Sequence, residues 1–296
     1  MTGAGNPEWL IQAFDAPPTH QGVEVEGAYV HYLEWGPADG SPVVLVHGGL
    51  AHAHWWDHIA PHLAGHRVVA LDLSGHGDSE TRVAGYDMMQ WGREIVAVIR
   101  DAGMEKPVVV GHSMGGYPSV ASGIEAPTEI LGVITLDSRF NDQEYSRGLK
   151  KSREFASLDE ALAHFNPVHS KSALDVSAGL LRHIGETSLR REGGSWRWKR
   201  DDNYWIRQAP LRELLPKLQV PFVIVQTEYG LVSDEHADEM RALTLAPSVA
   251  VKIPGAGHNP MLEQPLALIS VLRTLLATHL HSGGVVPNSH PLGRFS

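Results

Sequence analysis

Short apolar segments recur along the chain, and most of them are bounded by glycine or proline. Several are continuous runs of valine, isoleucine and leucine. Such runs are typical of strands that are buried on both faces of a mostly parallel sheet. The segments that we expect to form strands are 22–27, 28–35, 42–48, 66–75, 107–113, 131–137, 221–227 and 249–258.

Helical patterns lie between many of these strands. They cover residues 55–64, 88–102, 114–125, 233–245 and 265–280. Alternation of strand and helix at this spacing is typical of a doubly wound α/β fold, in which helices cover both faces of a mostly parallel sheet. We therefore predict an α/β fold class.

One interval interrupts the alternation. Residues 138–218 contain no convincing core strand and carry charged, helical patterns, so we expect an inserted and mostly helical subdomain. We expect residues 23–137 and 219–281 to form the core of the fold. Residues 1–22 are predicted to be a polar lead-in, and the Gly-, Pro- and Ser-rich residues 282–296 a disordered tail.

Composition limits the partners and the chemistry. The chain has 296 residues, a formal net charge of −10 and no Lys/Arg run, which argues against binding of nucleic acid or anionic membranes. It has no cysteine, so disulfides, thiolate catalysis and cysteine-bound zinc are excluded. We find neither a signal-peptide pattern nor an apolar run of about 18 residues. We expect a soluble cytoplasmic protein.

Residues 111–115 read Gly-His-Ser-Met-Gly and match the pattern G-x-S-x-G. This pattern forms a sharp strand-to-helix turn that lifts the serine hydroxyl above the sheet edge, and the glycines let neighbouring backbone pass closely. A valine-rich strand precedes the pattern and a helix-compatible segment follows it. We therefore expect Ser113 to be a nucleophile and the Met114 N–H to be an oxyanion donor.

A serine nucleophile needs a base and a second oxyanion donor. His258 is the best placed of the 18 histidines, because it follows a strand and a glycine-containing turn well after Ser113 in the chain. The loop 47–49, His-Gly-Gly, comes at the end of an earlier strand and can fold back toward the nucleophile. We expect the Gly49 N–H to be the second donor, with Leu50 as the alternative.

Together these residues resemble the α/β-hydrolase superfamily. The resemblance rests on residues 111–115, the loop 47–49, the "DLSGHGDS" segment 72–79 and the "GAGH" sequence that ends at His258. It spans residues 43–265 in the order of that superfamily. It implies an eight-stranded sheet, a triad of serine, acid and histidine, and a helical cap inserted after the sixth strand. In such proteins the segment 72–79 is mainly a structural loop.

The acid of the expected triad stays open. Many members of the superfamily place it after the seventh strand, where this chain has Glu228 and, further on, Asp234. Others supply it from the end of the sixth strand, where this chain has Asp137. Any carboxylate that reaches the histidine Nδ1–H is chemically adequate. Asp137 is our first choice and Glu228 the alternative.

Other residues are expected near the substrate or on the surface. The expected substrate-binding residues are His47, Gly48, Trp55 and His112. The histidine-rich segment 52–58 lacks the H-E-x-x-H spacing of a metal site and is expected to belong to a helix. We expect no metal and no organic cofactor. The aromatic and basic segment 196–200 is expected to form a cap surface or a wall over the pocket.

These expectations describe a serine hydrolase. Its substrate would be a small, apolar carboxylic ester or a related acyl compound such as a lactone or thioester, cleaved through an acyl-enzyme. C–C bond hydrolysis and cofactor-free perhydrolysis could use the same triad, and a small-molecule receptor is a further alternative. Serine at the turn argues against dehalogenases and epoxide hydrolases, because attack at an sp³ carbon needs a carboxylate nucleophile.

Overall fold

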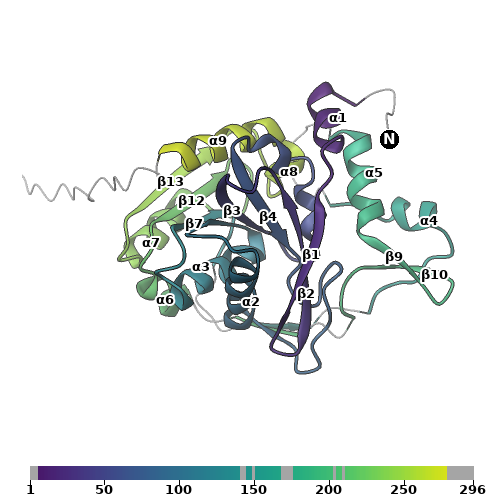
Figure 1. Ribbon diagram of the computed structural model, residues 1–296, viewed down its shortest axis with the longest axis horizontal. Coiled ribbons are helices and arrows are strands. Elements are labelled where there is room, and N and C mark those ends of the chain that lie inside the picture. Colours follow the sequence, from purple (N-terminus) through teal and green to yellow (C-terminus); the bar gives the residue numbers. More distant parts are fainter. Residues whose placement is uncertain are drawn as a thin grey trace, which may run out of the picture.

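An eight-stranded sheet forms the centre of the protein (Figure 1). The computed structural model describes residues 6–140, 145–148, 151–167, 176–202, 205–208 and 211–278, with 145–148, 205–208 and 211 described through their backbone alone. The strand order is β1-β2-β4-β3-β6-β7-β12-β13. The strands are β1 (Thr19–Val25), β2 (Ala28–Trp35), β3 (Ser41–Val46), β4 (His66–Leu71), β6 (Val108–His112), β7 (Gly132–Leu136), β12 (Phe222–Thr227) and β13 (Ser248–Ile253).

The sheet is mostly parallel. β2 pairs with β1 and with β4 in antiparallel fashion, whereas all the other neighbouring strands are parallel. The carboxyl ends of β3, β6, β7, β12 and β13 therefore meet at one edge of the sheet. Each of these strands overlaps a segment expected from the sequence, and the predicted eight-stranded α/β fold is confirmed.

Helices cover both faces of the sheet, as the alternating pattern predicts. The helices α2, α3 and α7 pack against one face, and α9 packs against the other (Figure 1), where Leu10 of α1 joins the same buried cluster. These helices are α1 (Glu8–Phe14), α2 (Met88–Asp101), α3 (Gly116–Glu125), α7 (Asp234–Leu243) and α9 (Pro265–Thr278).

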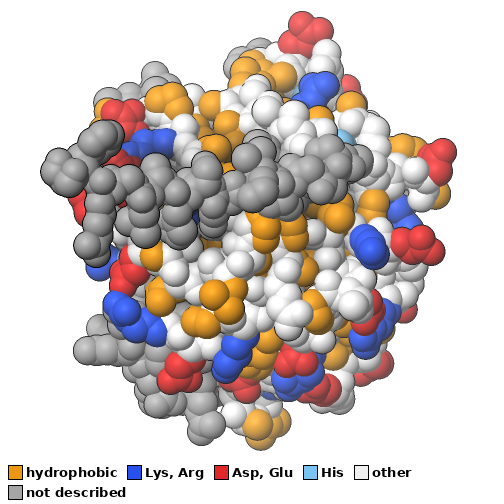
Figure 2. All heavy atoms as spheres, turned by 90° about the vertical axis from the view of Figure 1, so that its left-hand side faces the viewer, with side chains coloured by type: hydrophobic (Ala, Val, Ile, Leu, Met, Phe, Trp, Pro, Cys, Tyr) orange, Lys and Arg blue, Asp and Glu red, His pale blue; other side chains and the backbone are white. Residues whose placement is uncertain are grey.

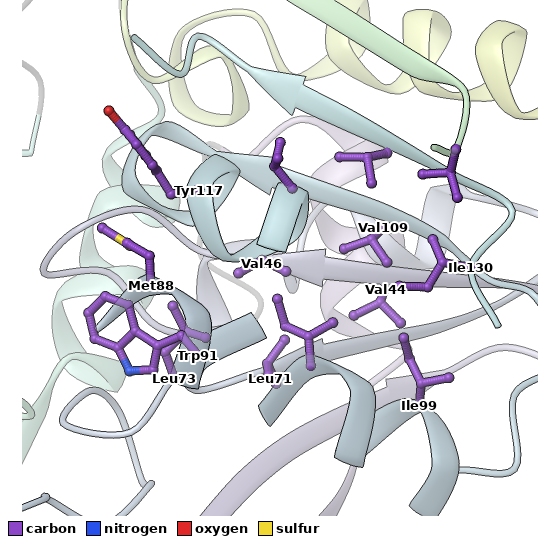
Figure 3. Close-up of a cluster of buried hydrophobic side chains, with 14 of the residues drawn as sticks. Val44, Val46, Leu71, Leu73, Met88, Trp91, Ile99, Val109, Tyr117 and Ile130 are labelled. Atoms are coloured by element: carbon purple, nitrogen blue, oxygen red, sulfur yellow. The ribbon is translucent and has the colours of Figure 1, made fainter. Parts of the chain in front are cut away.

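The two faces divide the side chains of each strand. Val44 and Val46 of β3 belong to one buried cluster, and Val43 and Leu45 belong to the other. Successive residues of a strand point to opposite faces, so a strand covered on both sides is apolar throughout. Figure 3 shows the first cluster, in which Trp91 of α2 lies against the strands.

The sequence predicts one helix over residues 55–64, and this prediction is wrong. The structure has two short 3-10 helices there, η1 (Ala53–Trp56) and η2 (Ala60–His62). Pro61 stands inside the predicted helix. Its nitrogen carries no hydrogen and its ring clashes with the preceding turn, so it opposes a continuous α-helix. Trp56 is nevertheless fully buried, as it would be on the apolar face of the predicted helix.

The segment between β7 and β12, which we expected to be mostly helical, contains short strands as well as helices. Gly193 and Gly194 have positive φ angles of 58° and 90°, the conformation that a two-residue hairpin turn needs, and they join β9 to β10. Within the described residues, none of these strands joins the central sheet. The elements are β8 (Tyr145–Gly148), α4 (Leu158–Ala163), α5 (Ala178–Thr187), β9 (Leu189–Glu192), β10 (Ser195–Trp198), β11 (Trp205–Gln208), α6 (Leu211–Leu214) and η4 (Leu215–Lys217).

The ends of the fold differ from the boundaries expected from the sequence. The helix α1 lies inside the predicted lead-in 1–22. The strand β1 begins at Thr19 rather than at residue 22, because Thr19 pairs with Glu34 of β2. The predicted tail 282–296 lies outside the described residues.

The surface in Figure 2 carries charges of both signs. Lys and Arg side chains are interspersed with Asp, Glu and hydrophobic side chains, so the described atoms of this face form no extended basic field. Across the part of the chain that the structure describes, no helix is both long enough and apolar enough to cross a membrane.

Four buried histidines have pKa values far below the usual one. Burial lowers the pKa of His52, His76 and His112 to about 3 and that of His58 to about 4, because a charged imidazolium loses its hydration in the interior. All four are therefore neutral at pH 7.

We expect the free energy of unfolding to fall as the pH drops from about 6.5 toward 4, by roughly several kcal/mol, because the unfolded chain then binds protons on these histidines and the folded chain does not. Urea denaturation at pH values between about 7.5 and 5 measures the change. His58→Gln keeps a donor for the Met261 carbonyl that His58 contacts, and should make the decline shallower. A free energy of unfolding that does not change over this range would contradict the prediction.

Candidate active site

Ser113 lies in a tight turn between β6 and α3, within the 3-10 helix η3 (Ser113–Gly115). Its φ angle is 51°, a conformation that non-glycine residues rarely adopt. A Cβ added to Gly111 would lie 2.3 Å from the Gly115 carbonyl oxygen, and one added to Gly115 would lie 2.3 Å from the His47 carbonyl oxygen. Both glycines are therefore required by the close approach of backbone around the serine.

Ser113, His258 and Asp137 form one line of hydrogen bonds. Ser113 Oγ lies 2.9 Å from His258 Nε2, and His258 Nδ1 lies 2.7 Å from Asp137 Oδ2. A carboxylate can only accept, so Nδ1 carries the hydrogen and Nε2 accepts the serine hydroxyl. In this arrangement the imidazole can take the proton of the serine.

Asp137 follows β7 and is fully buried, with a positive φ of 44°. Its carboxylate accepts the Leu231 N–H at 2.9 Å and the Val232 N–H at 3.1 Å. Both amides belong to the loop after β12, the neighbour of β7 in the sheet. A Cβ on Gly230 would lie 2.3 Å from Asp137 Oδ2. The loop can therefore approach the carboxylate this closely only with a glycine at position 230.

The other two candidate acids lie elsewhere. Glu228 Oε2 accepts the Gly255 N–H at 2.7 Å. Asp234 is paired with Lys252 and with the Gln226 side chain. The structure therefore brings Asp137 to His258, and it brings neither Glu228 nor Asp234 there.

Glu263 holds the backbone on both sides of His258. This buried residue belongs to the short helix α8 (Pro260–Glu263), and its carboxylate accepts the Gly257 N–H at 2.9 Å and the Asn259 N–H at 3.1 Å. Glu263 was not among the residues expected at the site. The sequence does show an acidic residue just after the loop that carries His258, and the backbone N–H groups of such a loop need acceptors.

His112 contacts the backbone of His258 itself. Its Nε2–H donates to the His258 carbonyl at 2.8 Å. His112 was expected to contact the substrate, and it does line the cavity beside Ser113. It also ties the turn that carries the serine to the loop that carries the histidine.

The expected oxyanion loop lies beside the serine. Gly49 and Leu50 line the same cavity as Ser113, and Leu50 has a positive φ of 63°. A Cβ added to Gly49 would lie 3.6 Å from Met114 Sδ, so the residues of the two expected oxyanion donors are neighbours.

His47 was expected to bind substrate, but it is not among the residues that line the cavity. Its Nδ1–H donates to the Gly48 carbonyl at 2.7 Å, and its Nε2 accepts the Leu73 N–H at 3.1 Å. Both ring nitrogens are thus occupied by backbone. The His47 side chain is buried, and through these two hydrogen bonds it holds the loop in place.

The cavity above Ser113 has a volume of about 340 Å³. The core of the fold contributes Gly48 and Trp55, both expected to contact the substrate, together with His258. The segment 138–218 contributes the opposite part of the wall, and its residues there are Phe165, Asn166, Pro167, Ser188, Trp198, Lys199 and Arg200.

The histidines of segment 52–58 are engaged within the protein. His52 Nε2 lies 2.7 Å from Ser188 Oγ, and Asp57 Oδ2 accepts both His54 Nδ1–H and His183 Nε2–H, at 2.9 and 2.7 Å. Among the described residues, His31, Asp72 and Asp78 bring possible metal ligands close together. In that group the Asp72 carboxylate already accepts hydrogen bonds from His31, from the Asp78 N–H and from backbone of η1.

Comparison with known proteins assigns the chain to a family. The model of the alpha/beta hydrolase family matches residues 43–271. The chain belongs to the alpha/beta hydrolase family. The superfamily and the enzyme class that the sequence predicts are thereby confirmed.

Two relatives of this hydrolase cover most of its length. Esterase Rv0045c of Mycobacterium tuberculosis is 27% identical over 266 residues, which are 86% of this chain and 88% of that protein. The uncharacterized carboxylesterase nap of Bacillus subtilis is 24% identical over 249 residues, or 79% of each chain. Among solved structures, the thioesterase domain from the curacin biosynthetic pathway has a TM-score of 0.72 at 22% identity, covering 86% of this chain and 98% of that one. That likeness shows the shared fold.

We expect Asp137→Asn to slow the reaction of Ser113 with a fluorophosphonate by at least about 100-fold, because an amide no longer stabilises the imidazolium or fixes the His258 tautomer. Intact-mass measurement of the labelling rate checks this. Glu228→Gln keeps an acceptor for the Gly255 N–H and should stay within about threefold of the unmodified protein. Fast labelling of Asp137→Asn together with slow labelling of Glu228→Gln would assign the acid to Glu228.

Proposed function

We propose that this hydrolase cleaves a carboxylic ester, or a related acyl bond such as a thioester or lactone, through an acyl-enzyme on Ser113. The observation that carries the proposal is the unbroken line from Ser113 Oγ through His258 to the buried Asp137 carboxylate. A serine hydroxyl is a weak nucleophile unless a neighbouring base takes its proton, and this geometry supplies the base.

In the first half of the reaction Ser113 Oγ attacks the carbonyl carbon, and its proton passes to His258 Nε2. Asp137 accepts the Nδ1–H and stabilises the resulting imidazolium. The tetrahedral intermediate then collapses, and the leaving alcohol or thiol takes the proton from Nε2. In the second half water repeats these steps on the acyl-enzyme and releases the acid.

The N–H groups of Met114 and Gly49 are the proposed donors to the oxyanion. Met114 directly follows the nucleophile at the start of a helix, and Gly49 lies in the loop opposite. Donors fixed before the reaction stabilise the developing charge without reorganisation. The proposed steps use only proton and acyl transfer among these groups, so they invoke no cofactor.

We also propose that residues 138–218 act as a cap over the site. Seven of the residues lining the cavity come from this segment, among them Phe165, Ser188 and Trp198. Walls supplied by an inserted segment would select the substrate, while the core supplies the chemistry. Two relatives that cover most of the chain are named as an esterase and a carboxylesterase, which supports the choice of ester bonds.

The test is hydrolysis of p-nitrophenyl esters of increasing acyl length. The unmodified protein should turn over at least the short esters, and Ser113→Ala should lower kcat by about 10⁴-fold or more, because the nucleophile is removed. A fluorophosphonate should add covalently to Ser113 and block turnover.

Ser270→Ala is the matched control, because Ser270 is an exposed serine of α9 whose hydroxyl donates within that helix. It should keep the turnover of the unmodified protein. Full activity in Ser113→Ala, or the absence of both ester hydrolysis and labelling in the unmodified protein, would overturn the proposed function.

A further inference from the structure

Two residues of the cavity lining have charged side chains, and both are cationic. They are Lys199 and Arg200, which follow β10, and no Asp or Glu is found among the described residues of the lining. The chain as a whole has a formal net charge of −10. A purely cationic lining in an acidic protein is a local feature that the cleavage chemistry does not require.

The backbone at Lys199 is fixed from two sides. Its N–H donates to the Ser188 carbonyl at 2.8 Å, and its carbonyl accepts the Gly77 N–H at 2.9 Å. The next residue, Arg200, forms a backbone bridge with His76 and donates from Nε to Ser152 Oγ at 2.9 Å. The backbone of both residues therefore has a defined place beside the cavity.

The Lys199 ammonium has an ion-pair partner on its outer side. Nζ lies 2.7 Å from Asp78 Oδ2, and the Lys199 side chain is 15% exposed whereas the Asp78 side chain is 41% exposed. Asp78 is not among the residues that line the cavity. An ion pair with a partly exposed carboxylate is weak, so a second anion on the cavity side can compete for this ammonium.

Ser188, whose carbonyl accepts the Lys199 N–H, contributes a neutral hydroxyl to the wall. Ser188 Oγ donates to the Ile184 carbonyl at 2.6 Å, so His52 Nε2–H must donate to Ser188 Oγ. Other parts of the lining are aromatic or apolar, including Trp55 and Trp198. A ligand in this cavity thus meets aromatic and apolar residues together with two cationic ones.

From this arrangement we infer that the substrate carries a carboxylate remote from the bond that is cleaved, and that Lys199, with Arg200 beside it, binds that carboxylate. The inference rests on the proposed function and narrows its substrate to small carboxylate-bearing esters. A substrate of this kind differs from the small apolar ester expected from the sequence. Lys199 then determines specificity through binding and takes no part in proton transfer.

The test compares esters that differ in one charge. On the acyl side, mono-p-nitrophenyl adipate is compared with p-nitrophenyl 6-methylheptanoate, in which an isopropyl group replaces the carboxylate. On the alcohol side, 3-carboxy-4-nitrophenyl hexanoate is compared with p-nitrophenyl hexanoate. We expect kcat/KM to favour the anionic ester about tenfold or more in at least one pair, since a hydrogen bond to a charged group is worth that much.

Three variants test whether Lys199 causes the preference. Lys199→Met should bring the ratio of anionic to neutral kcat/KM toward one, and Lys199→Arg should retain most of it. Asp78→Asn removes the competing carboxylate and should raise the ratio, an outcome that mere damage to the wall would not give. Lys217→Met is the matched control at an exposed lysine outside the cavity, and should leave the ratio unchanged.

Each outcome separates this inference from the proposed function. Hydrolysis of neutral and anionic esters through Ser113 with equal kcat/KM in both pairs would overturn the inference and leave the proposed function intact. A preference that survives in Lys199→Met, or that does not rise in Asp78→Asn, would also overturn it. Hydrolysis of none of the four esters, with no labelling of Ser113, would overturn both.

Discussion

The buried Asp137 carboxylate is the constraint on which the arrangement of this site depends. A carboxylate taken out of water is costly unless hydrogen-bond donors surround it. Asp137 receives donors from Leu231, Val232 and His258, all far from it in the chain. Those donors belong to the connections after β12 and β13. The charge is therefore stable only where β7, β12 and β13 lie side by side with their carboxyl ends at one edge, as the sheet order provides.

The same edge fixes the histidine. Asp137 holds its ring, Glu263 holds the amides on either side of it, and His112 holds its carbonyl. Because His112 precedes Ser113, the last contact also fixes the distance between the loop after β13 and the turn after β6. Serine and histidine are thus positioned by contacts between neighbouring strand ends, and such preorganisation is what nucleophilic catalysis requires.

The cavity combines two independent parts of the chain. The core carries the proposed reacting groups on strand ends, whereas the segment between β7 and β12 contributes Lys199 and Arg200 to the lining. The backbone of Lys199 is nevertheless joined to both parts, through Ser188 of the segment and Gly77 of the core. The proposed cleavage chemistry and the proposed selection for substrate charge therefore rest on different parts of the chain, as is general for sites carried by a common scaffold.

By itself the sequence determined the eight strands of the central sheet, the turn at Ser113 and the order of the proposed nucleophile and histidine, because runs of apolar residues and glycine spacing are local properties. It left the acid open between Asp137 and Glu228. It also predicted one helix over 55–64, where the structure has two short 3-10 helices, and it placed His47 at the substrate, although His47 does not line the cavity. Only the tertiary structure decided these points, together with the position of Lys199 in the cavity wall. The physical reason is that each depends on which strand ends and loops become neighbours in space, and periodicity along one chain reports burial but not the identity of the neighbour.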